Sequence, residues 1–244
     1  AEHFVARHVG PSVEDQQTML GMLDCSNLQQ LIEQVVPESI INDQPLDLLP
    51  QCTESQALKE LRQIANKNKI FKSFLGQGYY GSLTPNVILR NILENPAWYT
   101  AYTPYQPEIS QGRLEALINF QTMVTDLTGL EIANASMLDE GTAAAEAMTL
   151  SRRVSKSKSN RFFVDGDCLP QTIDIIATRA EPLGIEVEIG KPDECNGDVF
   201  GMLLQYPGVS GAIQDHRETI AKVKAQKGIV VMAADILSLV LLES

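Results

Sequence analysis

The sequence predicts an α/β fold in which a mostly parallel, incomplete sheet follows a helical N-terminal region. Two observations in the second half predict the sheet. Apolar strands alternate with helices, and the strands are apolar almost without a break, which is typical of parallel strands covered by helices on both faces. A third observation is that the first hundred residues read as short helices with clear start signals. We therefore expect a helical region with Gly- and Tyr-rich loops over residues 1–108 and the front part of an α/β domain over residues 109–244.

Hydroxyl side chains mark the starts of the N-terminal helices. Ser12 precedes two acidic residues in a first turn, where the helix dipole favours negative charge. Ser26 begins a second helix, which Pro37 ends. Residues 53–56 (TESQ) form a capping box before a third helix. Thr84 places a capping hydroxyl before a proline at the first helical position, and the apolar residues that follow give this fourth helix a buried side.

Glycine and tyrosine gather in the loops around this fourth helix. Three glycines lie within six residues, which forbids a stable helix and allows close backbone approach. Five of the six tyrosines fall within 27 residues, all in loop sequence: Tyr79, Tyr80, Tyr99, Tyr102 and Tyr105. The residues alone leave two interpretations open, namely packing between domains and lining of a cavity.

The chain pattern changes after Ser110. Apolar residues at helical spacing predict a long amphipathic helix that ends at Gly129. The elements expected after it are a helix over 140–153, a strand over 161–164, a helix over 171–179, a strand over 185–189, a buried apolar segment over 199–204, a helix over 215–226 and a strand over 228–234.

Composition excludes several classes of function. The formal charge of −12 and the pI of about 4.7 argue against binding to DNA, RNA or an anionic membrane, because the long-range field repels polyanions. The four cysteines form no CxxC or CxxH pair, which argues against a zinc site and favours reduced thiols in a cytosol. The sequence contains no run of 18 apolar residues, which excludes a membrane span. The N-terminal residues show no signal peptide or presequence pattern.

Motifs of common catalytic classes are also missing from the sequence. None of the three histidines has a serine or cysteine at a suggestive spacing, so a hydrolytic triad has little support. No GxGxxG follows a strand and no GxxxxGK[ST] occurs, which removes the usual dinucleotide and nucleoside-triphosphate fingerprints.

Two polar segments could carry chemistry at the carboxyl edge of the sheet, where open α/β folds bind ligands. Asp235 ends the last predicted strand. It is either a helix cap or the partner of a ligand cation such as a protonated pyridine nitrogen. Residues 134–143 lead into a helix whose N-terminus suits an anion, although Asp139 and Glu140 oppose one by charge. That segment is either an ordinary cap or a site.

An apolar run over residues 236–242 follows Asp235 with almost nothing after it. A complete domain seldom finishes in this way, because such a run needs a cover. We expect the chain to be the front piece of a longer protein.

Long ordered segments resemble the glycine decarboxylase P-protein family, the pyridoxal-phosphate component of the glycine cleavage system. The segments are FVARHVGP (4–11), GQGYY (76–80), LRNILENP (89–96), the run 98–117 with YTPYQPE and SQGRLE, and NASMLDEGTAAAEA (134–147). The resemblance covers the whole chain. It implies the fold of the large domain of type I pyridoxal-phosphate-dependent transferases, preceded by the helical region.

The resemblance implies that the chain is part of an enzyme that decarboxylates glycine through pyridoxal phosphate. The aminomethyl group would pass to the lipoyl arm of the H-protein. The lysine that holds the cofactor belongs to the second half of family members, so this chain carries no catalytic residue and no metal site of its own. By the resemblance the chain lines the substrate and cofactor cavity with Tyr79, Tyr80, Ser82, Tyr102, Asp139, Glu140, Gly141, Thr142 and Asp235, the last as the relic of the pyridinium partner.

The resemblance also implies partners and a location. The expected partners are the remainder of the P-protein, the H-protein and a second copy in a homodimer, with glycine as substrate. A bacterial cytoplasm is the expected location, and a mature mitochondrial chain is the alternative. Two functional alternatives stay open: a non-catalytic interaction module and another type I pyridoxal-phosphate decarboxylase. Gln77 and Leu169 depart from the family pattern, which usually has methionine and histidine at these positions.

Overall fold

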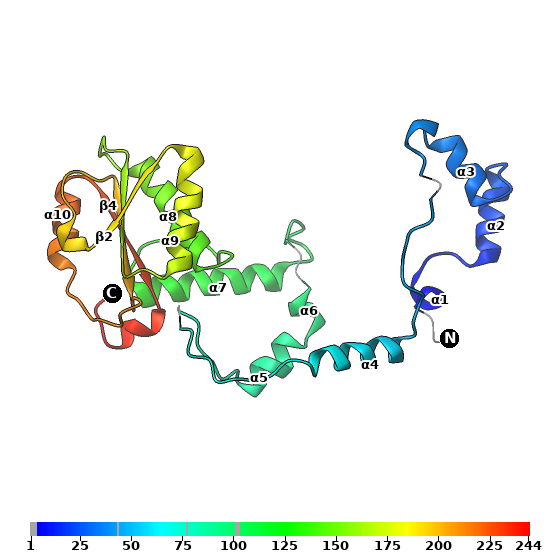
Figure 1. Ribbon diagram of the computed structural model, residues 1–244, viewed down its shortest axis with the longest axis horizontal. Coiled ribbons are helices and arrows are strands. Elements are labelled where there is room, and N and C mark those ends of the chain that lie inside the picture. The colour runs from blue at the N-terminus through cyan, green and yellow to red at the C-terminus, as the bar shows by residue number, and fades with distance from the viewer. Residues whose placement is uncertain (1–3, 43, 77, 101–102) are drawn as a thin grey trace. The chain divides into compact units, whose positions relative to one another are not determined.

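The computed structural model describes residues 4–42, 44–76, 78–100 and 103–244. The chain divides into two compact units, Ala1–Lys72 and Ser73–Ser244, each described separately here (Figure 1). The domain boundary expected at residue 108 stays a prediction.

The first unit consists of short helices. They are α1 (Val5–His8), α2 (Val13–Met22), α3 (Leu28–Val35), a 3-10 turn (Glu38–Ile40) and α4 (Glu54–Ala65). Capping boxes at Ser12 and Thr53 confirm two of the predicted helix starts. The prediction that Ser26 begins α3 is wrong by one residue, because Asn27 caps the helix by accepting the N–H of Gln30.

The helix start expected at Thr84 differs more from the structure. The helix α5 covers only Asn86–Ile88 and passes into the π-helix Leu89–Leu93, and no side chain caps it. Pro85 takes the N-cap position, so the Thr84 hydroxyl has no capping role. The apolar side expected to be buried is exposed. Tyr99, expected in a loop, is helical instead, in α6 (Pro96–Tyr99).

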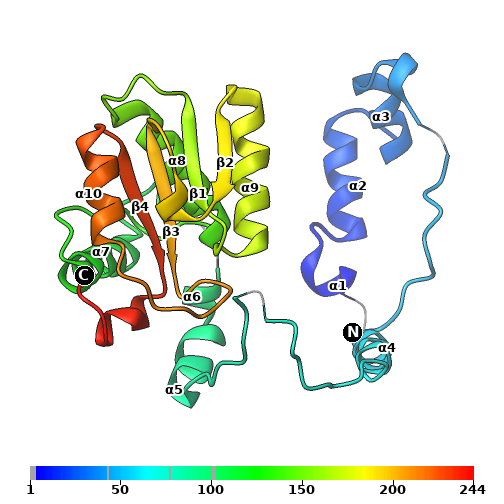
Figure 2. The same ribbon diagram turned by 60° about the vertical axis from the view of Figure 1, so that its left-hand side comes forward.

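The second unit contains the predicted parallel sheet. Its further helices and strands are α7 (Gln111–Thr128), α8 (Glu140–Val154), β1 (Arg161–Asp165), α9 (Pro170–Ala180), a 3-10 turn (Glu181–Leu183), β2 (Glu186–Gly190), a 3-10 turn (Pro192–Glu194), β3 (Gly201–Tyr206), α10 (Arg217–Ala225), β4 (Ile229–Ala234) and a 3-10 helix (Ile236–Val240). The four strands are parallel and lie in the order β2-β1-β3-β4, which Figure 2 shows in reverse from left to right.

Both faces of the central strands are buried, as their apolar sequences predict. Phe162 and Leu203 belong to a core cluster to which α8 and α9 contribute. Their chain neighbours Phe163 and Leu204 belong to a second cluster, with Val223 of α10. Since successive side chains of a strand point to opposite faces, helices on both faces explain the unbroken apolar pattern.

All four cysteines are free thiols, and Cys25 and Cys168 are buried. Burial raises the pKa of the Cys168 thiol to about 12, so this thiol stays protonated and unreactive at neutral pH. Within the described part of the chain, no helix combines the length and the apolar character that crossing a membrane requires.

Candidate functional site

A hollow of about 720 Å³ lies at the carboxyl ends of β3 and β4. The first turn of α8, the loop 207–211 after β3 and the end of β4 contribute to its walls. The strand order reverses between β1 and β3, because the chain leaves β1 toward one edge and β3 toward the other. In open parallel sheets ligands bind outside the carboxyl ends of the strands near such a reversal, so the hollow lies where this fold places sites.

Tyr80 and Asp235, 155 positions apart in the sequence, meet at the rim of this hollow. The Tyr80 hydroxyl donates a hydrogen bond to Oδ2 of Asp235 at 2.9 Å. This bond to the carboxylate raises the pKa of the Tyr80 phenol. The phenol is therefore a neutral donor at neutral pH, and the glycine- and tyrosine-rich loop is joined to the end of β4.

Asp235 is also a helix cap, which was one of the two sequence interpretations. Its Oδ1 accepts the N–H of Leu237 at 3.0 Å, at the start of the 3-10 helix Ile236–Val240. The Leu237 N–H, followed by the Tyr80 hydroxyl, lowers the pKa of the Asp235 carboxyl. The carboxylate is ionised, and each of its oxygens already accepts one hydrogen bond.

A buried amide connects three walls of the hollow. Gln205, near the end of β3, is 7% exposed. Its Oε1 accepts the N–H of Leu169 at 3.1 Å and its Nε2 donates to Oε1 of Glu140 at 3.3 Å. These two bonds fix which way the amide points and hold the Glu140 carboxylate toward β3. Sequence reasoning missed Gln205, although a single polar residue in an otherwise apolar strand was the available signal.

The segment 139–142 contributes one residue to the cap of α8 and another to the lining of the hollow. Asp139 caps α8 by accepting the N–H of Thr142 at 2.7 Å, and this bond lowers the pKa of its carboxyl. Gly141 is packed against Ile175 of α9, where a Cβ would lie 2.4 Å from Cδ1. Among the described residues of this segment, only Glu140 lines the hollow.

Most of the other predicted site residues are not among the described lining of the hollow. Tyr79 is exposed, and neither it nor Ser82 belongs to the described lining. Tyr102 and Gln77 lie outside the residues that the structure describes. Leu169 lines the hollow and contacts Gly78, where an added Cβ would lie 2.3 Å from Cδ1 of Leu169. The φ of +86° favours glycine at this position.

The hollow is acidic. Glu140 and Asp235 are its charged lining residues, and none of the described residues that line it is a lysine, arginine or histidine. The described lining thus offers carboxylates, a phenol and an amide as polar groups. It offers no amine that could bind an aldehyde and no cation that could neutralise a phosphate.

The comparisons with known proteins agree with one another. A family model described as glycine cleavage system P-protein matches residues 6–244. A protein of Bordetella avium named glycine dehydrogenase (decarboxylating) is 57% identical over 239 residues, which are 98% of this chain and 25% of that protein. One of Cereibacter sphaeroides with the same name is 58% identical over 238 residues, 97% of this chain and 25% of the relative. The chain therefore spans about a quarter of the length of the curated relatives it matches.

A solved structure shows a similar fold. It is a crystal structure of glycine decarboxylase, the P-protein of the glycine cleavage system, in an inhibitor-bound form. The match has a TM-score of 0.84 at 31% identity and covers 97% of this chain and 55% of that chain. Both units of this chain therefore have counterparts in one solved protein.

Proposed function

The chain belongs to the glycine cleavage system P-protein family, as its motifs predicted, and on this premise we propose that it forms part of an enzyme that decarboxylates glycine. The α/β sheet is that of a type I pyridoxal-phosphate enzyme. In the proposal pyridoxal phosphate is the cofactor, and the aminomethyl group of glycine passes to the lipoyl arm of the H-protein. The family match over residues 6–244 carries this proposal.

The residues of the hollow do not by themselves fit pyridoxal phosphate. The cofactor needs a lysine for its covalent bond and donors or cations for its phosphate, and among the described lining residues there is no lysine or arginine. Asp235 already accepts hydrogen bonds at both oxygens. We propose that the lysine lies elsewhere in the P-protein polypeptide and that this chain supplies a wall of the site.

Tyr80, Glu140 and Asp235 are the wall residues that the geometry favours, because all three line the hollow. The Gln205 amide is held by a buried hydrogen bond and presents a fixed dipole. The Tyr80 phenol is exposed and is oriented by its hydrogen bond to Asp235. The remaining residues of the predicted lining stay candidates: Tyr79, Ser82, Tyr102, Asp139, Gly141 and Thr142.

The wider organisation is part of the same proposal. The helical region 1–108 and the α/β region 109–244 would be separate domains of a bacterial cytoplasmic enzyme. That enzyme would be a homodimer with the H-protein as its partner. The bacterial relatives and the reduced thiols support this location.

A chimera tests the function directly. This chain replaces the matching segment of the Bordetella avium protein, to which it is 57% identical. Exchange of labelled carbon dioxide with the carboxyl group of glycine is then measured with pyridoxal phosphate and lipoylated H-protein. We expect exchange with glycine and with no other amino acid.

The two rival functions predict other outcomes of this assay. Another type I decarboxylase would make the chimera exchange carbon dioxide with a different amino acid. A non-catalytic module would give a folded chimera without exchange. Either result would contradict the proposed function.

A further inference from the structure

We propose that Asp167 is a positioning residue, which fixes one wall of the hollow by latching the loop after β3 to the loop after β1. The inference rests on the proposed function for its kinetic test. Asp167 itself is not among the described lining residues. It would act through the loop 207–211, whose residues line the hollow.

Three hydrogen bonds form the latch. Oδ1 of Asp167 accepts the N–H of Ser210 at 2.8 Å, and Oδ2 accepts the Ser210 hydroxyl at 2.7 Å. The carbonyl oxygen of Asp167 accepts the N–H of Val209 at 2.8 Å. One residue thus holds two consecutive peptide groups and a side chain of the opposite loop. The two bonds to its carboxylate are charge-assisted, which makes them the stronger ones.

The latch is fixed on its own side by β1. Oδ1 of Asp165, the buried last residue of β1, accepts the N–H of Asp167 at 3.0 Å. On the opposite side Gly208 lies directly on the latch. A Cβ at Gly208 would be 2.1 Å from Oδ2 and 2.7 Å from the carbonyl oxygen of Asp167, so only glycine fits there.

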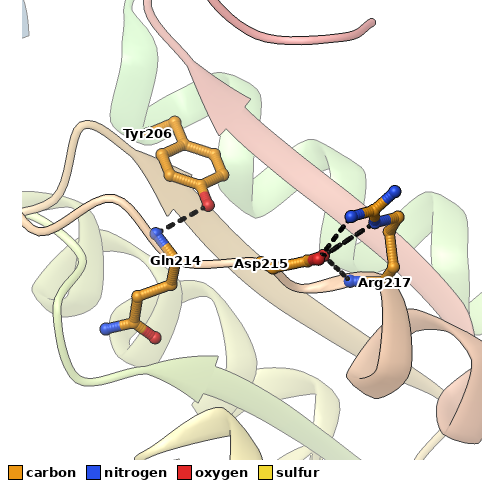
Figure 3. A network of polar contacts seen from close by, with 4 residues as sticks. All are labelled: Tyr206, Gln214, Asp215 and Arg217. Atoms are coloured by element: carbon orange, nitrogen blue, oxygen red, sulfur yellow. Dashed lines mark hydrogen bonds and ion pairs between the residues drawn. The ribbon is translucent and has the colours of Figure 1, made fainter.

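The far end of the loop is anchored separately. The Tyr206 hydroxyl accepts the N–H of Gln214 at 3.1 Å, and the Asp215 carboxylate binds the backbone N–H and the guanidinium of Arg217 (Figure 3). Hydrogen bonds to Arg217 lower the pKa of Asp215 to about 2. This anchor restrains residues 214–217, and the described lining of the hollow includes none of them.

The wall therefore depends on Asp167. For residues 208–212, the hydrogen bonds that the structure describes either stay within the loop or end on Asp167. The latch also joins the loops after β1 and β3, the two strands between which the strand order reverses. Ligands of such sheets bind at this position, so a shift of the wall alters the shape that a ligand meets.

Matched variants separate positioning from charge. Asp167→Ala removes both side-chain acceptors. Asp167→Asn keeps an oxygen for the Ser210 N–H and an amide that can donate to the Ser210 hydroxyl oxygen, so it should restore the latch without the charge. Asp215→Ala is the control, because it removes a carboxylate that also binds a backbone N–H, that of Arg217 at the start of α10, but is not among the described lining of the hollow.

The first measurement uses this chain alone. Amide hydrogen exchange at Ser210 should become at least about tenfold faster in Asp167→Ala, which removes the acceptor of this N–H. The Ser210 rate should stay near the wild-type value in Asp215→Ala and Asp167→Asn. Equal exchange rates at the Ser210 amide in Asp167→Ala and Asp215→Ala would overturn the latch.

The second measurement uses the chimera with the Bordetella avium protein. Asp167→Ala should raise KM for glycine about tenfold with kcat within about twofold, and Asp167→Asn should recover most of the loss. An unchanged KM in an active Asp167→Ala chimera, or the same loss in Asp167→Asn, would overturn the positioning role. If the unsubstituted chimera lacks glycine exchange, the proposed function fails, and amide exchange alone decides on the latch.

Discussion

Large apolar side chains meet opposite environments in two regions of the second unit. In the centre of the sheet Phe162 is fully buried and Phe163 is 1% exposed. Beyond the end of β4, Leu237 is 68% and Leu241 85% exposed. An apolar sequence therefore indicates which side chains favour burial. Whether they are buried depends on the helices that pack on both faces of the sheet.

The two edge strands of the described sheet sharpen this comparison. β2 carries Glu186 and Glu188, and charged residues on an edge discourage pairing with another chain. β4 (IVVMAA) carries no charge and pairs with β3 alone among the described strands. Its sequence is that of an interior strand, so β4 is the edge at which we expect association.

The largest effect should come from truncating the buried region. Phe162→Ala should lower the free energy of unfolding by about 3–5 kcal/mol, because it removes a fully buried ring and leaves a cavity. Leu241→Ala truncates a large apolar side chain in the exposed region and should change the free energy of unfolding by less than about 0.5 kcal/mol. Denaturant titration measures both, and similar losses would remove the contrast.

The carboxylates of Asp165 at the end of β1 and Asp235 just after β4 should give opposite pH dependences. Burial raises the pKa of Asp165, so the folded state holds its proton more tightly than the unfolded state does. Its contribution to stability is present below the usual value near 3.8 and is lost as pH rises through the raised pKa. Asp165→Asn should remove this loss, as the pH dependence of the unfolding midpoint would show.

Asp235 should behave in the reverse way. Its pKa is lowered, so its contribution is present above 3.8 and is lost as pH falls through the folded pKa. Asp235→Asn should therefore weaken the protein at neutral pH and not in acid. The same sign of change in both variants would contradict the raised pKa of Asp165 and the lowered pKa of Asp235.

A smaller change in stability, with a clear change in association, is expected at the exposed run. Leu237→Glu with Leu241→Glu should alter the free energy of unfolding by less than about 0.5 kcal/mol, because both side chains already face solvent. The double variant should bind less hydrophobic dye and scatter less light than the wild type. Undiminished dye binding would contradict this prediction, because the apolar surface that binds the dye would then lie outside the exposed run.

The smallest effect concerns the Tyr80–Asp235 pair. Ultraviolet titration should show that Asp235→Asn lowers the pKa of the Tyr80 phenol toward its ordinary value of 10.0, because the raised pKa depends on the carboxylate. Tyr80→Phe should remove that phenol from the titration while the other tyrosines remain. An unchanged titration curve in Asp235→Asn would exclude the hydrogen bond in solution.

The sheet could be predicted from sequence because strand patterns are local. Apolar runs, the caps at Ser12 and Thr53 and the C-terminal Gly129 of α7 each act within a few residues, and the structure confirms them. The helix start expected at Thr84 was wrong because Pro85 occupies the N-cap position and no side chain caps the helix. Motif resemblance identified the family over the whole chain.

The site was less accessible to sequence reasoning because its contacts are distant in the chain. Tyr80 and Asp235 were both candidates, but nothing in their spacing predicted their hydrogen bond. Gln205 and Asp167 were not candidates, since a polar residue in a strand or a loop acquires its role only from the loops folded against it. Such partners become visible when the strand order is known.

The central claim is that this chain supplies a wall of a pyridoxal-phosphate site whose lysine lies elsewhere. Borohydride reduction of the cofactor-loaded chimera, followed by mass spectrometry of its peptides, tests it most directly. The account predicts a single pyridoxyl-lysine in the part contributed by the Bordetella avium protein. A pyridoxyl adduct on a lysine within residues 1–244 of this chain would contradict it.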